Sequence, residues 1–269
     1  MRIITLTITI LLILACTCSA GVLIVSKTGA PNESESEKSQ QRAYLQSKGM
    51  RMEFEDGDEV HVAIFRADKD LLWVIDKDNG SYFEMTREDL QKLKKQLDAM
   101  FKELDEQMQS MPPAQRDMMM QMMGDKIPTK EPEMSFKKIA SSVKVLSWVC
   151  DHYEGYADGK KKAEFWTVNF DKVGIDKDEF KVLQDMGEFF SEIIPNQSSF
   201  FGMFTGESAG GDKQGMDFGL PVKIETFGDN GKEYSTNITE VTKHDCPASL
   251  FDLPKGLKKD EMPQETFGL

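Results

Sequence analysis

The segment RMEFEDGDEVHVAI, residues 51–64, has the pattern of a β-hairpin. Apolar residues alternate with polar ones on both sides of Asp56-Gly57, beginning with Met52 and Phe54. Alternation with a period of two places apolar side chains on one face of a strand, and Asp-Gly supplies the positive φ angles of a tight turn. We therefore predict two antiparallel strands with one buried face and one polar face.

The same turn chemistry recurs three more times, at Asn79-Gly80, Asp158-Gly159 and Asn230-Gly231. Each dipeptide lies between β-patterned runs, which is typical of hairpins in an antiparallel sheet. The pattern predicts strands over about 22–85, 134–168 and 220–243.

The run Leu71–Ile75 is apolar throughout, so we expect a strand that is covered on both faces, where helices pack. The strands resume after a helical interruption, and the run 220–243 has too little apolar material for a core of its own. We therefore predict a mainly β protein with some α-helix. Its fold would be a single curled antiparallel sheet, an open and unclosed β-barrel.

A helical pattern occupies residues 86–123, where eight of the seventeen methionines lie. Apolar residues recur there at the spacing of one helix face, at Leu90, Leu93, Leu97, Met100, Phe101, Leu104, Met108 and Met111. Thr86 with Asp89 forms a capping-box pattern, and Pro112 and Pro113 end the helix. We expect an amphipathic helix of about six turns, followed by a second helix from Gln115 to Met123.

The second helix is apolar on every side, because five of the six residues 118–123 are methionine and successive residues point about 100° apart. Two interpretations stay open. The helix is either core between the sheet and the first helix, or a lid over an apolar cavity. With a further helix over about 176–193, we expect helices that lie across the concave face of the sheet as a lid.

Residues 195–219 are rich in glycine and serine but include the aromatic residues Phe200, Phe201 and Phe204. Disordered segments contain few aromatics, so we predict a mobile flap with an apolar tip. The tip either packs under the sheet edge or touches a ligand or a membrane. The domain organisation that follows is one domain over 21–269, with a helical insertion at 86–124 and the flap at 195–219.

Residues 1–20 have the composition of a secretory signal peptide, in which Arg2 precedes an apolar core and Cys18-Ser19-Ala20 forms a small-residue end. We expect cleavage after Ala20 and a periplasmic or secreted protein. Two alternatives stay open. The uncharged run is long enough to be retained as an N-terminal anchor, and Cys16 resembles a lipoprotein processing site that would make the protein lipid-anchored.

The formal charge of −13 over 269 residues argues against nucleic acid as a partner, because binding to phosphates requires basic surface. Removal of Arg2 with the signal peptide would change this charge to −14. Membrane association stays possible, and so does a protein partner in the cell envelope.

Two cysteines, Cys150 and Cys246, remain after cleavage. In an oxidising compartment an isolated pair favours a disulfide bond, which we predict. The alternatives are two buried free thiols, or a zinc site in which His152 and His244, each two residues from a cysteine, complete the ligands.

No catalytic set is evident, because the chain lacks the Gly-x-Ser-x-Gly and His-Glu-x-x-His patterns and a phosphate-binding glycine loop. We predict no enzymatic activity and no cofactor. Copper(I) bound by the thioethers of residues 118–123 is a further alternative, because soft ligands suit that ion, although no histidine lies between His61 and His152.

The order of several sequence features resembles an exported bacterial family of unknown function whose members are similar to the outer-membrane lipoprotein carriers. These features are Gly49-Met50-Arg51, Asp68, Trp73, Asp76, Tyr82, the run 111–116, the run 148–153 and the run 250–256. The resemblance implies an open antiparallel β-barrel covered by helices, with an apolar interior that receives acyl chains. It also implies that Arg51 interacts with the lid.

We therefore expect a non-enzymatic protein of the periplasm or envelope that binds a lipid or another hydrophobic small molecule under the methionine-rich helices. The residues expected to line the lid and the cavity are Met100, Met108, Met111, Met118, Met119, Met122, Met123, Trp73 and Phe101. A structural or protein-interaction module without a ligand is the alternative, and metal binding is a further one.

Overall fold

A computed structural model describes residues 20–57, 59–112, 115, 134–191, 193, 218–228 and 231–261 of the protein. The strands in this part of the chain form one sheet in the order β12-β6-β5-β4-β3-β2-β1-β11-β10-β9-β8-β7. Every neighbouring pair is antiparallel except β12 with β6. The sheet has twelve strands and is not closed into a barrel, which confirms the predicted mainly β, antiparallel architecture.

The strands are β1 (Ala20–Gly29), β2 (Ser39–Gln46), β3 (Gly49–Asp56), β4 (Glu59–Arg66), β5 (Leu71–Asp76), β6 (Ser81–Thr86), β7 (Met134–Val145), β8 (Trp148–Ala157), β9 (Lys160–Val168), β10 (Leu220–Gly228), β11 (Gly231–Asp245) and β12 (Lys258–Lys259). The helices are α1 (Arg87–Ser110), α3 (Phe170–Val173) and α4 (Lys181–Phe190), with the 3₁₀ turns η2 (Lys177–Phe180) and η3 (Ala248–Phe251).

The predicted hairpin turns are present, because the glycine of each turn has a positive φ angle. These angles are 61° at Gly57, 63° at Gly80, 76° at Gly159 and 106° at Gly231. Glycine adopts this conformation without the steric cost that a Cβ atom imposes. Each predicted turn therefore connects two neighbouring antiparallel strands of the sheet.

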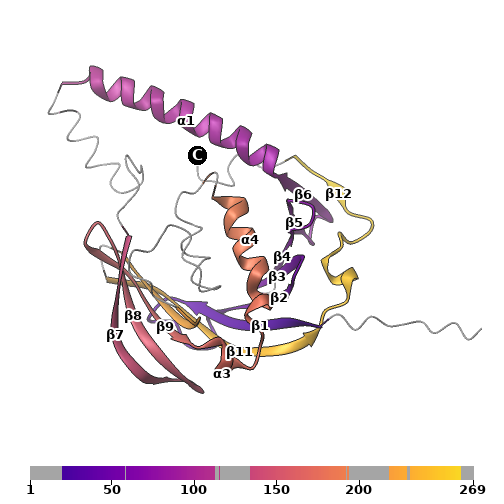
Figure 1. The fold of residues 1–269 in the computed structure, drawn as a ribbon. Helices are drawn as coiled ribbons and strands as arrows, with labels where there is room; N and C mark the ends of the chain where they lie inside the picture. The colour runs from indigo at the N-terminus through magenta and orange to yellow at the C-terminus, as the bar shows by residue number, and fades with distance from the viewer. Residues whose placement is uncertain are drawn as a thin grey trace, which may run out of the picture.

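The chain crosses the sheet in two passes that meet at β1 and β11. Strands β1 to β6 follow one another, after which the chain moves to the far edge and returns through β7, β8, β9, β10 and β11. The pair β1–β11 joins the two halves, with Ile24 opposite Val241. Figure 1 shows the sheet curving around α4.

Helix α4 supplies the core on the inner face of this curve. Its buried residues are Val182, Leu183, Met186, Gly187 and Phe189. All of these except Gly187 belong to the main apolar cluster, which also contains Val22, Leu45, Phe65 and Leu72 from four strands. The rings of Phe65 and Phe189 lie 5.4 Å apart. The helix predicted at about 176–193 is therefore the one that fills the hollow of the sheet.

The C-terminal segment, residues 246–261, covers the opposite face of β4 and β5. Its Cys246 and Phe251 form a second buried cluster with Val62, Ile64, Trp73 and Ile75. At the edge, β12 pairs in parallel with β6. The expectation that β5 is covered on both faces is confirmed. A helix covers one face, whereas this irregular C-terminal segment covers the other.

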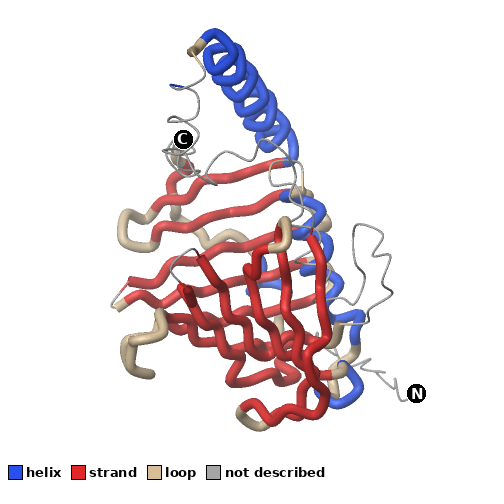
Figure 2. Tube along the Cα trace, turned by 90° about the vertical axis from the view of Figure 1, so that its left-hand side faces the viewer, coloured by secondary structure: helices blue, strands red, loops and turns tan. Residues whose placement is uncertain are grey.

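Helix α1 starts at the predicted position. Thr86 is its N-cap, and the capping box with Asp89 is formed in both directions. Figures 1 and 2 show α1 leaving the sheet at the end of β6 and extending beyond the strands. The helix packs on the sheet through its first turn, where Leu90 is fully buried.

Several predictions fall outside the described residues. These concern the signal peptide with Cys16, the methionines Met118, Met119, Met122 and Met123 of the second helix, and Phe200, Phe201 and Phe204 of the flap.

Candidate functional site

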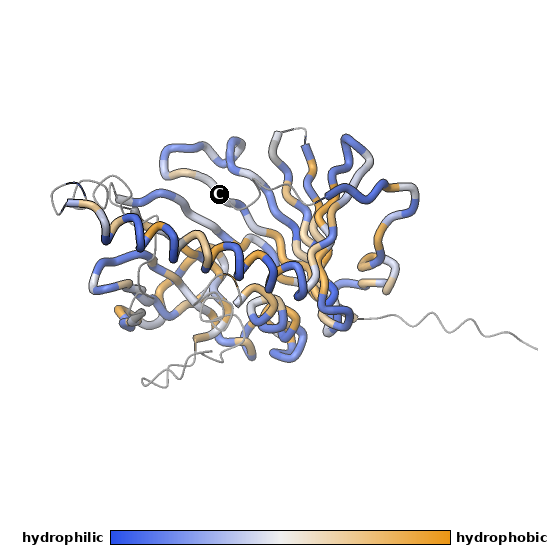
Figure 3. Tube along the Cα trace, turned by 90° about the horizontal axis from the view of Figure 1, so that it is seen from above, coloured by the Kyte–Doolittle hydropathy of each residue, from blue (hydrophilic) through white to orange (hydrophobic). Residues whose placement is uncertain are grey.

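The apolar stripe of α1 is the first candidate site, because most of it is only partly covered. Leu93, Leu97, Leu104 and Met108 are half-buried, and Met100 is 43% exposed. Figure 3 shows hydrophilic and hydrophobic residues alternating along α1, as expected for an amphipathic helix. Apolar side chains in one row on a helix usually mark a surface that is covered by something else.

The first turn of α1 is held in place by three contacts. Leu90 belongs to the main apolar cluster. Arg87 pairs with Asp70, with 2.8 Å between Nη2 and Oδ1. The guanidinium of Arg87 also lies 5.8 Å from the ring centre of Phe189 on α4. The start of α1 is thus fixed relative to α4, and the stripe continues away from this fixed point.

Three of the methionines predicted to line a cavity lie on or next to α1. Met100 and Met108 are on the helix, and Met111 is its half-buried C-cap. Phe101 also lies on α1, but its side chain is outside the described part of the structure. The structure places these residues along one helix, in agreement with the predicted periodicity.

Trp73 lies elsewhere. It is buried against the C-terminal segment in the second apolar cluster, together with Ile64 and Phe251. Its neighbour Leu72 belongs to the main cluster with α4, and successive residues of a strand point to opposite faces. The structure therefore does not bring Trp73 together with the methionines of α1.

Arg51 is on the same outer face as Trp73. In the register of the sheet it lies between Tyr44 and Ile64, both of which belong to or pack on the second cluster. Its Nε is 2.8 Å from Oε1 of Glu53. The adjacent Met50 and Met52 belong to or pack on the main cluster with α4. The position of Arg51 on the opposite face from α4 does not support a tether to the helices.

Cys150 and Cys246 are both free and buried, so the predicted disulfide bond is absent from the structure. Cys150 lies on β8 in the main apolar cluster, whereas Cys246 follows β11 in the second cluster. Sγ of Cys246 packs so closely on Gly21 that a Cβ atom there would lie 2.7 Å from it. The sheet separates the two clusters, which is why the two thiols do not meet.

The zinc alternative required the two cysteines and two histidines to converge, and they do not. His152 stacks on Trp166, with ring centres 4.4 Å apart. His244 lies against Tyr44, with ring centres 5.6 Å apart. Within the described ranges, the structure contains no group of three or more His, Cys, Asp or Glu side chains that could hold a metal ion.

A network of ion pairs crosses β8, β9, β10 and β11, and it was not predicted from the sequence. Glu225 on β10 is its most buried member, 6% exposed, and pairs with Lys223 and Lys232 at 2.7 Å each. Burial acts to raise the pKa of Glu225, but the hydrogen bonds from both lysines outweigh it and lower the pKa below its usual range.

The network continues on the neighbouring strand β9. Glu164 accepts a hydrogen bond from Lys161 at 2.5 Å, and it lies 3.2 Å from Nε2 of His152. The ammonium of Lys223 lies 4.3 Å from the ring centre of Trp166, which links this group to Glu225. Lys161 also lies 3.6 Å from Glu154 on β8, so the network has three lysines and three glutamates, and it connects four strands.

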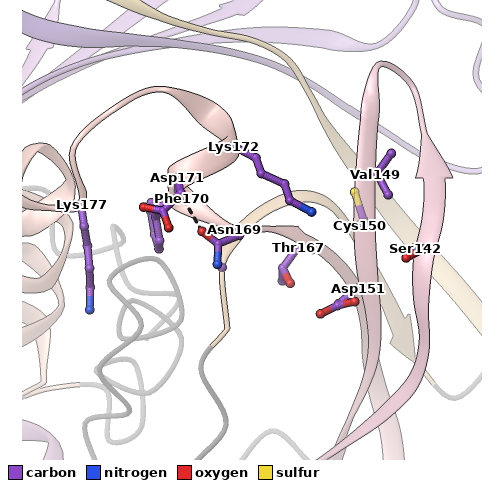
Figure 4. Close-up of a pocket in the computed structure, with 11 residues that line it drawn as sticks. Ser142, Val149, Cys150, Asp151, Thr167, Asn169, Phe170, Asp171, Lys172 and Lys177 are labelled. Carbon is purple, nitrogen blue, oxygen red and sulfur yellow. Dashed lines mark hydrogen bonds between the residues drawn. The ribbon is translucent and has the colours of Figure 1, made fainter.

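A polar cavity of about 260 Å³ lies where β7, β8, β9 and α3 meet. Figure 4 shows the residues that line it, among them Asp151, Thr167, Asn169 and Lys172. Cys150 also lines the cavity, and burial raises the pKa of its thiol to about 11. The thiol is therefore protonated at neutral pH and is a poor nucleophile.

The residues of this cavity carry no sequence signature. Asp151 and Thr167 are opposite each other on β8 and β9, and Asn169 and Lys172 follow at the start of α3. The one local indication is Asn169, because asparagine is a common N-cap residue of helices. Its side chain accepts a 2.9 Å hydrogen bond from the backbone N–H of Asp171.

Comparisons with known proteins do not place the chain in a family. No protein-family model matches it, and no curated protein matches it. An uncharacterised conserved protein from Thermus thermophilus superposes with a TM-score of 0.45 and 8% identity, covering 91% of each chain. The structure of PNGF-II superposes with a TM-score of 0.37 and 10% identity, covering 92% of this chain and 32% of that one. Similarities of this extent carry no information about function.

None of the helices in the described part of the chain combines the length and the apolar character needed to cross a membrane.

Proposed function

We propose that the protein is an exported, non-enzymatic binding protein for a hydrophobic ligand, a lipid or an acyl chain, and that α1 forms one wall of the binding site. The observation that carries this proposal is the row of apolar residues on α1 beyond its anchored first turn. Leu90 in the first turn is fully buried, whereas Leu97, Leu104 and Met108 beyond it are half-buried.

The anchoring of α1 supports a role as a wall rather than as core. Arg87 and Leu90 fix the start of the helix on the sheet and on α4. The core of the sheet is completed by α4, whose Phe189 is fully buried. The apolar stripe of α1 is therefore not needed to fill the hollow of the sheet, and its side chains are available to an apolar guest.

The chemistry of the stripe suits a flexible ligand. Leucine and methionine side chains make non-directional contacts, and methionine adapts to guests of different shape. Each methylene of an acyl chain that is buried contributes about 0.8 kcal/mol, so a few buried methylenes offset the cost of ordering the chain. The sequence resemblance to the outer-membrane lipoprotein carriers points to the same class of ligand.

The test is displacement of a fluorescent fatty-acid probe. We expect saturable binding by the wild-type protein, and at least tenfold weaker binding when Leu97, Leu104 and Met108 are replaced together by Gln. The matched control carries Lys95→Gln, Lys102→Gln and Glu106→Gln, which lie on the opposite side of the same helix and are exposed. The control should bind the probe like the wild type.

Two results would contradict the proposal. The first is absence of saturable probe binding by the folded wild-type protein. The second is equal loss of binding in the stripe variant and in the control, because binding would then not depend on the stripe. If the wild type instead forms a dimer that the stripe variant does not form, the stripe is a protein contact, and the protein is an interaction module.

We also propose that residues 1–20 are removed on export. Gly21 and Val22, which directly follow this segment, pair with His244 and Lys243 of β11. N-terminal sequencing of the protein from the envelope fraction should begin at Gly21. A mature N-terminus at Cys16 would instead establish lipid anchoring, and an intact N-terminus would establish a retained anchor.

A further inference from the structure

The polar cavity next to α3 has the features of a small-molecule site, and it lies apart from the apolar stripe of α1. Its volume of about 260 Å³ is slightly below the usual range of ligand pockets, which suits a molecule of a few heavy atoms. Its lining comes from β7, β8, β9, α3 and η2, so distant parts of the sequence converge on it.

Thr167 is the buried polar group of the cavity. Its side chain is 3% exposed and lines the cavity, and its hydroxyl makes no hydrogen bond within the described part of the chain. The hydroxyl of Thr167 can donate to, or accept from, a polar group placed in the cavity.

Asp151 supplies a negative charge beside Thr167. The two residues are directly opposite each other on β8 and β9, which places their side chains on the same face. Lys138 donates to Asp151 at 2.7 Å, and Ser141 and the backbone of Ser142 also donate to it. Burial acts to raise the pKa of Asp151, but these hydrogen bonds lower it overall, so the carboxylate is ionised at neutral pH.

A bulge in β7 positions these donors. The register between β7 and β8 shifts between Ala140 and Val143, and Ser142 has a φ angle of 60°. Bulges of this kind redirect side chains at the edge of a sheet. The bulge turns Ser142 toward the cavity, of which it is a lining residue.

Lys172 supplies the positive charge. It projects from α3 and, within the described residues, has no ion-pair partner. Figure 4 shows its side chain extending toward Thr167 and Asp151, whereas Asp171 points away from them. Oδ1 of Asn169 accepts a hydrogen bond from the backbone N–H of Asp171. The Nδ2 group of Asn169 therefore remains as a donor.

We propose that this cavity binds a small zwitterion of amino-acid size, with its carboxylate on Lys172, Thr167 and Asn169 and its ammonium group on Asp151. The cavity lining offers donors from Lys172, Thr167 and Asn169 and an ionised carboxylate from Asp151, which match the two charges of such a molecule. A simple anion would lie close to the carboxylate of Asp151, which Lys138 already pairs with at 2.7 Å, and a simple cation would lie close to Lys172.

The experiment is titration calorimetry of the full chain with glycine, L-alanine and L-serine, each alone, and with acetate, methylammonium and inorganic phosphate as single-charge probes. We expect saturable binding of at least one zwitterion, and at least tenfold weaker binding of every single-charge probe. Absence of saturable binding by all three zwitterions would overturn the proposal, and so would phosphate or acetate binding as tightly as the best zwitterion.

Variants then locate the site. Lys172→Met should weaken zwitterion binding by about tenfold to a hundredfold, the usual range for loss of a charged hydrogen bond. Thr167→Val, which keeps the shape of the side chain, should weaken it about fivefold or more. The control Lys160→Met removes an exposed lysine at the turn between β8 and β9 and should have no effect.

Unchanged binding in folded Lys172→Met would overturn the assignment. Fatty-acid probe binding to α1 is a separate readout, so either proposal can fail without the other.

Discussion

The indole of Trp73 on β5 donates a 2.9 Å hydrogen bond from Nε1 to Oε2 of Glu84 on β6. The other oxygen of Glu84 accepts a hydrogen bond from Nζ of Lys259 at 2.8 Å. One carboxylate therefore connects a buried indole to the C-terminal segment, at the place where β12 pairs with the edge of the sheet. This connection assigns Trp73 a role in holding the outer layer.

We predict that Glu84→Gln lowers the free energy of unfolding by about 1 kcal/mol at neutral pH, because two hydrogen bonds to a charged acceptor are weakened. The hydrogen bonds from Lys259 and Trp73 lower the pKa of Glu84. A depressed pKa contributes stability above the unfolded-state pKa of about 4.3, and this stability is lost as the pH falls through the folded-state pKa.

Urea unfolding at about pH 7 and about pH 3 measures this effect. The difference in the free energy of unfolding between the variant and the wild type should become smaller in acid. The control Glu88→Gln, on an exposed side chain of α1, should change stability by less than about 0.5 kcal/mol.

Glu225→Gln should be more costly, about 2 kcal/mol or more, because the change leaves Lys223 and Lys232 close together without the buried carboxylate between them. The pKa of Glu225 is also lowered, so its contribution is present above about pH 4.3 and disappears at lower pH. Urea unfolding of Glu225→Gln beside Glu240→Gln, an exposed acid on β11, tests this. Equal effects of the two changes would show that the ion-pair network adds nothing to stability.

Both cysteines should be free in the mature protein. Alkylation of denatured protein without reductant is expected to label Cys150 and Cys246, whereas the native protein should react slowly at both. The slow reaction follows from burial and from the raised pKa values, about 11 for Cys150, which keep the thiols protonated. Protection of both residues in the denatured, unreduced protein would mean that a bridge forms and that the two clusters rearrange.

The different roles of α4 and α1 predict different costs for truncation. Phe189→Ala should destabilise the protein by about 3 to 5 kcal/mol, because the ring is fully buried where α4 packs on the sheet. Leu104→Ala should cost about 1 kcal/mol or less, because Leu104 is half-buried beyond the anchored turn of α1. Thermal and urea unfolding of both variants would measure this contrast. Similar losses at the two positions would mean that the stripe of α1 is part of the core.

Local patterns in the sequence were sufficient for much of the fold. The positive φ angles needed at Gly57, Gly80, Gly159 and Gly231 depend on one residue and its neighbours, so the turn dipeptides predicted the hairpins. The capping box at Thr86 is likewise a contact between residues three apart, and it was predicted for the same reason. The apolar periodicity of α1 also depends on spacing alone.

What covers each face of the sheet depended on contacts between distant residues. The sequence by itself determined that strand Leu71–Ile75 is buried on both faces, but only the tertiary structure decided that α4 covers one face and the C-terminal segment the other. The separation of Cys150 from Cys246, the outward position of Arg51 and the convergence of Thr167 with Lys172 were decided in the same way. The physical reason is that period and turn chemistry are encoded by neighbours along the chain, whereas the choice of packing partner depends on the burial and shape of the whole folded chain.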